Sequence, residues 1–278
     1  MTNIATINKI IRPANFLITF FSITVAALIC ATGLFSLSKI FLAALSGALA
    51  AASGNVINDI FDIEIDKINR PDRPLPSGRM SLNEASVLYF LLIVMSLVAA
   101  YFVNHAAFII DLTALTILFF YSFRFKKIIL IGNLIVAFLT ALAFIYGGIA
   151  VGNFKDALIP ASFAFLINFI REIVKDMEDI DGDLKSGISS FPHRYGFNRA
   201  KIIIATLSLL LIGATIYPFV AKIYGLEYLL IIAVFVDPVI IYILTILFKD
   251  DSPAGLSKIS FILKLNMVFG LAAIYLGK

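Results

Sequence analysis

Charged residues are scarce in this sequence. Asp, Glu, Lys and Arg make up 14% of its 278 residues, against 61% hydrophobic residues, and a soluble domain usually carries about a quarter. There is no tryptophan, and the single cysteine, Cys30, excludes an intramolecular disulfide. We expect Cys30 to be a buried apolar residue. The net charge of +4 resides in the connections between apolar runs, so it does not indicate nucleic-acid binding.

Long uncharged runs take the place of the missing charge. Pro13–Ser38, Ala85–Asn104 and Ile128–Phe154 carry no charged residue, and each is long enough to cross about 30 Å of hydrocarbon as a helix. The runs lack strand alternation, which disfavours a β-barrel. We therefore predict an all-α polytopic membrane protein, a single domain over 1–278 with about nine transmembrane helices. Their expected positions are roughly 14–36, 39–66, 82–103, 106–123, 129–150, 156–183, 199–221, 227–248 and 257–277.

Basic residues alternate between successive connections. The N-terminus holds Lys9 and Arg12, and the connections at 67–79, 124–127 and 185–201 are basic, whereas those between them nearly lack Lys and Arg. The positive-inside rule then places the N-terminus and these basic loops in the cytoplasm and the C-terminus outside. We therefore expect an integral protein of the cell membrane.

Two acidic clusters share the spacing D-x2-D-x3-D and one constant offset. On a helix these positions fall within roughly 60° of arc, so each cluster would form a stripe of carboxylates at a cytoplasmic helix end. Such a stripe repels itself, and hard oxygen ligands suit Mg²⁺ bound together with phosphate. Solvated acidic helix ends are the simpler alternative, which the matched spacing disfavours. The predicted metal ligands are Asn58, Asp59, Asp62, Asp66, Asp176, Asp179 and Asp183.

Basic residues near the first cluster are candidates for binding a diphosphate. Arg70 and Arg73 lie in a proline-rich turn that follows it, and Lys126 ends the segment that starts at Tyr121. Arginine matches phosphate oxygens with a bidentate fork. The alternative is that these residues serve only as a topology signal. Asp111 and Asp237 lie inside apolar runs, where we expect a protonated or hydrogen-bonded structural role.

These motifs resemble those of the UbiA superfamily of intramembrane prenyltransferases. The resemblance covers essentially the whole chain and rests on N-D-x2-D-x3-D at 58–66, R-P-x-R-P-x-x-S-G at 70–78 and the second cluster at 176–183. Within the superfamily the chain is most similar to the archaeal branch that makes digeranylgeranylglyceryl phosphate, through Arg12-Pro13-x-Asn15 and Ile131-Gly132-Asn133. One departure is that Lys175 stands where the offset would place a counterpart of Asn58.

The resemblance implies a helix bundle whose two clusters face each other across a central cavity. Mg²⁺ would bridge them to a prenyl diphosphate, with Asp59, Asp62, Asp176 and Asp179 as the catalytic set. The C–O bond would ionise to an allylic cation, which the acceptor hydroxyl attacks. In the archaeal branch the donor would be geranylgeranyl diphosphate and the lipid acceptor geranylgeranylglyceryl phosphate. Arg12 and Asn15 are the candidates for the acceptor phosphate.

Three other functions compete with this one. An aromatic-acid prenyltransferase of quinone synthesis would share the superfamily's motifs. A CDP-alcohol phosphotransferase would need one continuous D-x2-D-G-x2-A-R run, which the chain lacks. A cation transporter usually binds its ion near the bilayer midplane at broken helices, whereas these clusters lie at predicted cytoplasmic helix ends.

Overall fold

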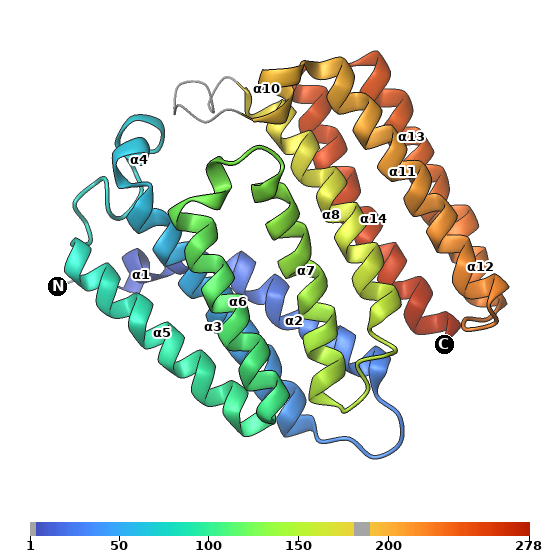
Figure 1. The fold of residues 1–278 in the computed structure, drawn as a ribbon, viewed down its shortest axis with the longest axis horizontal. Coiled ribbons are helices and arrows are strands. Elements are labelled where there is room, and N and C mark those ends of the chain that lie inside the picture. The colour runs from blue at the N-terminus through green and yellow to red at the C-terminus, as the bar shows by residue number, and fades with distance from the viewer. Residues whose placement is uncertain (1–3, 181–189) are drawn as a thin grey trace. The chain divides into compact units, whose positions relative to one another are not determined.

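The computed structural model describes residues 4–180 and 190–278, and these residues are almost entirely helical (Figure 1). Eight helical segments are long and apolar enough to cross a membrane. A further long helix, α8, ends in a charged stretch that contains Arg171, Glu172, Lys175 and Asp176. The predicted all-helical membrane fold is confirmed. The long helices are α2 (Pro13–Cys30), α3 (Leu37–Phe61), α5 (Leu82–Val103), α6 (His105–Phe123), α7 (Ile131–Ala150), α8 (Leu158–Glu178), α11 (Phe197–Val220), α12 (Leu226–Ile231) continued by η2 (Ile232–Val236) and α13 (Asp237–Lys249), and α14 (Pro253–Gly277).

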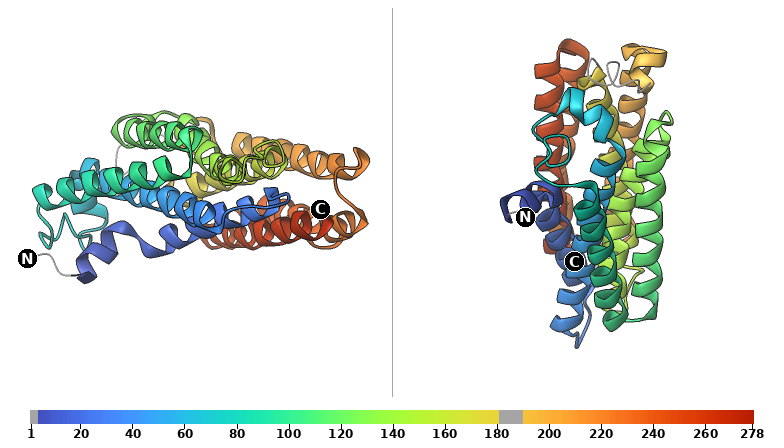
Figure 2. Two further views of the ribbon diagram at one scale, coloured as in Figure 1. Left: turned by 90° about the horizontal axis from the view of Figure 1, so that it is seen from below. Right: turned by 90° about the vertical axis from the view of Figure 1, so that its left-hand side faces the viewer.

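Two helix breaks lie near the first acidic cluster. The N-terminal segment consists of α1 (Ile4–Ile11) and α2, and Arg12 between them has a positive φ of 55°. Pro13 explains this break, because proline lacks an N–H and disfavours a right-handed helical conformation in the residue before it. The predicted helix 39–66 divides at Asp62 into α3 and α4 (Ile63–Asn69). Figure 2 shows α1, the dark-blue helix at the N-terminus, set at an angle to α2.

The described chain forms two compact units. The first comprises the chain up to Lys126 together with Leu142–Ala157, and the second comprises Lys127–Ala141 together with the chain from Leu158 onward. In the second unit α8 packs against α11 and α14, and the short α10 (Phe191–Tyr195) packs against α8 and α11. Asp176 of the second acidic cluster lies near the end of α8 in this unit, and Asp179 directly follows the helix.

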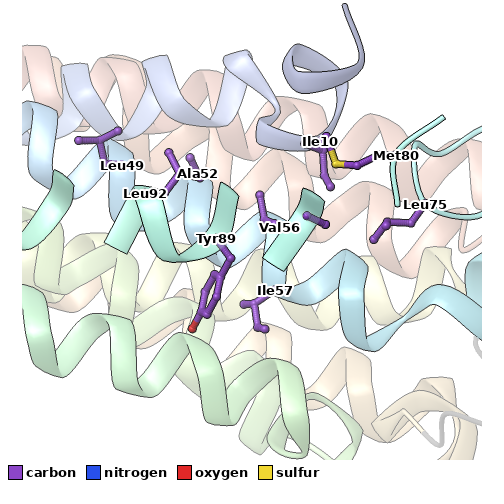
Figure 3. Packing of buried hydrophobic residues seen from close by; sticks show 10 residues of the cluster. Ile10, Leu49, Ala52, Val56, Ile57, Leu75, Met80, Tyr89 and Leu92 are labelled. Carbon is purple, nitrogen blue, oxygen red and sulfur yellow. The ribbon is translucent and has the colours of Figure 1, made fainter. Parts of the chain in front are cut away.

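In the first unit, α3 lies against α1, α2, α5 and α6. Its buried face is rich in alanine, which lets neighbouring helices approach closely. A core cluster joins Ile10 of α1 to Val56 of α3, Tyr89 of α5 and Leu75 of the loop after α4 (Figure 3). This core therefore fixes the N-terminal helix and the proline-rich loop at the same end of α3. Cys30 is buried, as predicted.

Two carboxylates inside the apolar helices are hydrogen-bonded. Asp111 of α6 accepts a hydrogen bond from the Ser96 hydroxyl of α5 at 2.7 Å and is 3% exposed. Asp237 of α13 accepts one from the Thr215 hydroxyl of α11 at 3.1 Å. Polar contacts of this kind hold helices together in an apolar environment. They fit the structural role expected of both residues.

Gly147 offers a test of the close contact between α7 and α2. A Cβ atom added there would lie 2.6 Å from the Ile23 carbonyl oxygen and 2.8 Å from the Ala27 backbone nitrogen. We expect Gly147→Ala to lower the unfolding free energy by about 1–3 kcal/mol, because backbone atoms must move apart. Thermal unfolding in detergent measures this as a lower Tm.

Gly213 of α11 provides the matched control, since an added Cβ would meet nothing within 4 Å. Gly213→Ala should leave the Tm unchanged or raise it, because alanine favours the helical state by roughly 0.5–1 kcal/mol. Equal Tm values for the two variants would contradict the close packing at Gly147.

Candidate functional site

The first acidic cluster lies where α3 passes into α4. Asp59 is 2% exposed and Asp66 is 5% exposed. Both bind the same guanidinium group: Arg73 Nη1 lies 3.2 Å from Asp59 Oδ1 and 2.5 Å from Asp66 Oδ2. Arg73 comes from the proline-rich loop, which returns over the end of α3. One arginine therefore joins carboxylates that are two helical turns apart.

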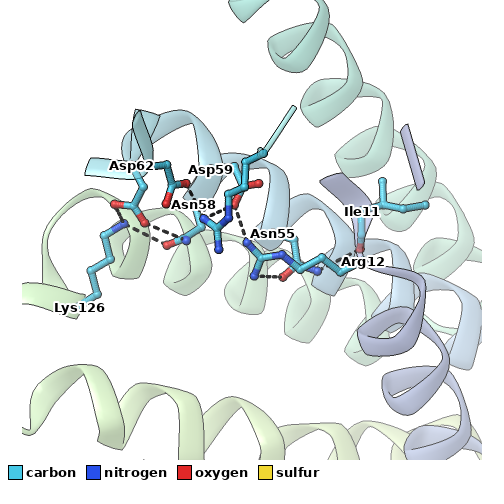
Figure 4. A network of polar contacts seen from close by, with 9 residues as sticks. Ile11, Arg12, Asn55, Asn58, Asp59, Asp62 and Lys126 are labelled. Atoms are coloured by element: carbon cyan, nitrogen blue, oxygen red, sulfur yellow. Dashed lines mark hydrogen bonds and ion pairs between the residues drawn. The ribbon is translucent and has the colours of Figure 1, made fainter. Parts of the chain in front are cut away.

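Asp62 faces a different cation. Lys126, which follows α6, places its Nζ 2.5 Å from Asp62 Oδ1 and 3.0 Å from Asn58 Oδ1, and Asn58 Nδ2 donates to Asp62 Oδ2 at 3.0 Å (Figure 4). The predicted single stripe is thus divided between two cations. Asp62 lies at the break between α3 and α4, with φ −96° and ψ 5°.

Arg12 lies in the cluster rather than apart from it. Its Nη2 is 2.5 Å from Asp59 Oδ1, and Asn55 Nδ2 donates to the Ile11 carbonyl oxygen at 3.1 Å (Figure 4). Asn55 was not predicted as a site residue, although it precedes Asp59 by one helical turn and shares its face. The predicted partner of Arg12, Asn15, is exposed, and its side chain makes no hydrogen bond to the described residues.

The charges of the first cluster balance within the protein. Its three carboxylates are matched by Arg12, Arg73 and Lys126. Such pairing is needed because burying an unpaired carboxylate costs several kcal/mol. Arg70, in contrast, is exposed and forms no ion pair with any described residue, so it is available to an anion.

The second acidic cluster is built differently. Asp176 accepts a hydrogen bond from Asn133 Nδ2 of α7 at 2.9 Å. Asp179 is half-exposed, and its Oδ2 lies 4.0 Å from Lys175 Nζ. Arg171 and Glu172 pair at 2.8 Å one turn earlier on α8. Asp183 lies outside the described residues.

Asn133 is the site residue of this unit that the sequence did not reveal. The sequence motif Ile131-Gly132-Asn133 contributed to the family resemblance, but it predicted no role for the Asn133 side chain. The structure shows a parallel between the clusters, since a carboxamide donates to an aspartate in each of them. In the first cluster Asn58 comes from the same helix as Asp62, whereas Asn133 comes from a different helix. Lys175 stands at the position that matches Asn58, and Asn133 supplies the carboxamide donor in its place.

The ligand types present suit a hard divalent cation. Carboxylate and carboxamide oxygens are available in both units, although no three acidic side chains among the described residues converge as one metal site. Mg²⁺ fits this arrangement, because it usually takes only one or two carboxylates and completes its octahedron with water and phosphate oxygens. The fold and the first cluster together define a helical membrane protein in which acidic and basic side chains lie close together, a combination suited to a metal ion and a phosphorylated substrate.

Comparison with known proteins identifies the family. The model of the UbiA prenyltransferase family matches residues 19–268. The chain belongs to this family and is a prenyltransferase, as its motifs predicted.

Individual relatives cover nearly the whole chain. A protein of Methanocaldococcus jannaschii named digeranylgeranylglyceryl phosphate synthase is 40% identical, over 81% of this chain and 79% of the relative. A solved structure of a digeranylgeranylglyceryl phosphate synthase is 36% identical, with a TM-score of 0.83 over 100% of this chain and 99% of the other. A UbiA homologue from Archaeoglobus fulgidus, bound to DMAPP and Mg²⁺, shares the fold at 24% identity, with a TM-score of 0.71 over 97% of this chain and 99% of the other.

The shared role of Arg73 can be tested by its removal. Arg73→Ala leaves the buried Asp66 without its cation and deprives Asp59 of one of two. We expect the unfolding free energy in detergent to fall by roughly 3 kcal/mol, as for other broken buried pairs, with a lower Tm. Lys67→Ala is the control, because its ion pair with Glu64 is 52% and 77% exposed and should contribute less than about 1 kcal/mol. A similar Tm for both variants would exclude a structural role for Arg73.

Proposed function

We propose that the chain transfers a geranylgeranyl group from geranylgeranyl diphosphate to geranylgeranylglyceryl phosphate in a Mg²⁺-dependent reaction. The observation that carries this proposal is the acidic cluster at the end of α3, whose carboxylates pair with arginine and lysine side chains of the kind that bind phosphate. Relatives named digeranylgeranylglyceryl phosphate synthase, 40% and 37% identical over 81% and 95% of the chain, support the choice of donor and acceptor.

The first cluster would bind the diphosphate. Asp59, Asp62 and Asp66, with Asn58, supply oxygen ligands for Mg²⁺, which when bound would stabilise the negative charge that develops on the leaving diphosphate. Arg73 and Lys126 pair with these carboxylates and would also contact the diphosphate oxygens. Arg70 is exposed and has no ion pair within the described part of the chain, so it would contact the diphosphate without breaking one.

The second cluster would act on the same diphosphate. Asp176, Asp179 and Asp183 repeat the spacing of the first cluster, which supports a shared role in metal binding. The hydrogen bond from Asn133 orients the Asp176 carboxylate. Lys175 would offset part of the charge of Asp179, at 4.0 Å.

The reaction follows from this arrangement. The bond between C1 of the prenyl chain and the diphosphate oxygen breaks, and the oxygen keeps the electron pair. The acceptor hydroxyl then attacks C1 and forms an ether bond, and its proton passes to the released diphosphate. Apolar helices around the site would keep water from attacking the allylic cation. Asp59, Asp62, Asp176 and Asp179 remain the proposed catalytic set.

A cation transporter is a weaker candidate for this geometry. Arg12, Arg73 and Lys126 already occupy the carboxylates of the first cluster, so a bare cation would compete with three fixed positive charges. An anionic diphosphate that arrives with Mg²⁺ gives both the carboxylates and the basic side chains a partner. Nothing in the described residues specifically favours an aromatic acceptor.

Prenyl transfer in detergent tests the metal ligands. Asp62→Ala and Asp179→Ala should each lower transfer from labelled geranylgeranyl diphosphate by at least about 100-fold, because each removes charge stabilisation at the leaving group. Glu64→Ala and Glu178→Ala are acidic controls from the same segments and should keep most of the activity. Unchanged transfer by both aspartate variants would refute the metal-site model, and transfer to aromatic acids alone would refute the lipid acceptor.

The membrane orientation is also proposed, with the N-terminus and the site loops in the cytoplasm and the C-terminus outside. The alternation of basic connections supports it. In a Cys30→Ser background, Leu34→Cys should react with an impermeant thiol reagent on intact cells. Asp72→Cys, in the proline-rich loop, should react only after permeabilisation. The reverse pattern would require the opposite orientation.

A further inference from the structure

A cation-rimmed hollow in the second unit has no part in the site described above. It has a volume of about 540 Å³ and is bounded by the segment that precedes α7 and by α10. Lys127 and Arg194 supply its charge, and Ile128, Leu130, Phe191 and Tyr195 are among its apolar and aromatic lining residues. The hollow therefore combines positive charge with an apolar surface, a combination that suits an anionic amphiphile.

Within residues 4–180 and 190–278, no carboxylate neutralises the positive charge of this hollow. Lys127, Arg194 and the nearby Arg199 form no ion pair with the described residues. Arg194 and Arg199 instead lie over the Tyr195 ring, at 5.8 Å and 6.0 Å from its centroid. Stacking of this kind orients a guanidinium group while its N–H donors stay available. Arg12, Arg73 and Lys126 differ from these cations, because each of them pairs with a carboxylate.

The lining of the hollow leads directly to the second acidic cluster. Leu130 has a positive φ of 62°, a conformation that costs free energy in a branched residue and recurs at binding sites. Only three residues later, Asn133 of α7 donates to Asp176. The other side of the hollow, α10, packs against α8, which carries Asp176 and ends just before Asp179. The two segments that form the hollow therefore adjoin the helices that carry and contact Asp176.

We propose that this hollow binds the phosphomonoester of the acceptor lipid, with Lys127 and Arg194 on the phosphate and the apolar lining against the first carbons of the chain. The proposal rests on the proposed function. A phosphomonoester carries about −1.5 to −2 charges at pH 7 and accepts the two-pronged hydrogen bonds of arginine. The proposal assigns the acceptor phosphate to Lys127 and Arg194, which pair with no carboxylate among the described residues, instead of to Arg12, which is bound to Asp59.

Steady-state kinetics separate the two substrates. For Arg194→Gln and Lys127→Gln we expect the KM for geranylgeranylglyceryl phosphate to rise by about 10-fold, the usual loss for a charge-assisted contact. The KM for geranylgeranyl diphosphate should stay within about 2-fold. Arg194→Lys should recover part of the loss, and Lys155→Gln, which removes a cation elsewhere, should change neither constant. An equal rise in both KM values, or no change in either, would overturn the proposal.

A binding measurement without catalysis keeps this proposal distinct from the proposed function. In nanodiscs of phosphatidylcholine, wild-type protein should bind 1-oleoylglycerol 3-phosphate about 10-fold more tightly than Arg194→Gln does, whereas monooleoylglycerol should not distinguish them. That difference would support the hollow even if the wild-type protein failed to prenylate the lipid acceptor. Its absence would overturn the hollow even if transfer were normal. Loss of the difference in phosphatidylglycerol nanodiscs would also overturn it, because the hollow would then bind bulk anionic lipid.

Discussion

Neutralisation of buried carboxylates is the constraint on which the first unit depends. Asp59 and Asp66 are removed from water at the end of an apolar helix, where an unpaired charge would be unstable. The protein meets this requirement with cations drawn from three separate segments: the start of α2, the proline-rich loop and the end of α6. The ion pairs thus also hold those segments against α3, and Arg73 holds the proline-rich loop at the end of that helix.

The break at each end of this network makes the pairing possible. Pro13 prevents α1 and α2 from forming one straight helix, and the positive φ of Arg12 directs that residue toward Asp59. At the other end, Asp62 has an irregular backbone conformation between α3 and α4. Its side chain pairs with Lys126, whereas Asp59 and Asp66 pair with Arg73. Packing of Ile10 against Leu75 and Met80 then holds the N-terminal helix and the loop together. Local backbone irregularity and apolar packing therefore act in concert at the site.

The two acidic clusters are similar in sequence and different in structure. In the first, ion pairs balance every carboxylate. In the second, Asp176 accepts a hydrogen bond from the neutral carboxamide of Asn133, and the half-exposed Asp179 lies 4.0 Å from Lys175. Within the described residues, the carboxylates of the first cluster are therefore matched by cations, whereas Asp176 is matched by a neutral hydrogen-bond donor.

The sequence by itself determined the helical membrane fold, the family and the positions of both clusters. Hydrophobic runs such as Ala85–Asn104 have no soluble alternative, and the matched aspartate spacing is a local property of each segment. Only the tertiary structure decided which cation meets which carboxylate. Arg12 was expected to bind an acceptor phosphate but pairs with Asp59. Asn133 had no predicted role but donates a hydrogen bond to Asp176. Such pairings join residues far apart in the chain, so they depend on how helices pack and where they break, which local spacing does not encode.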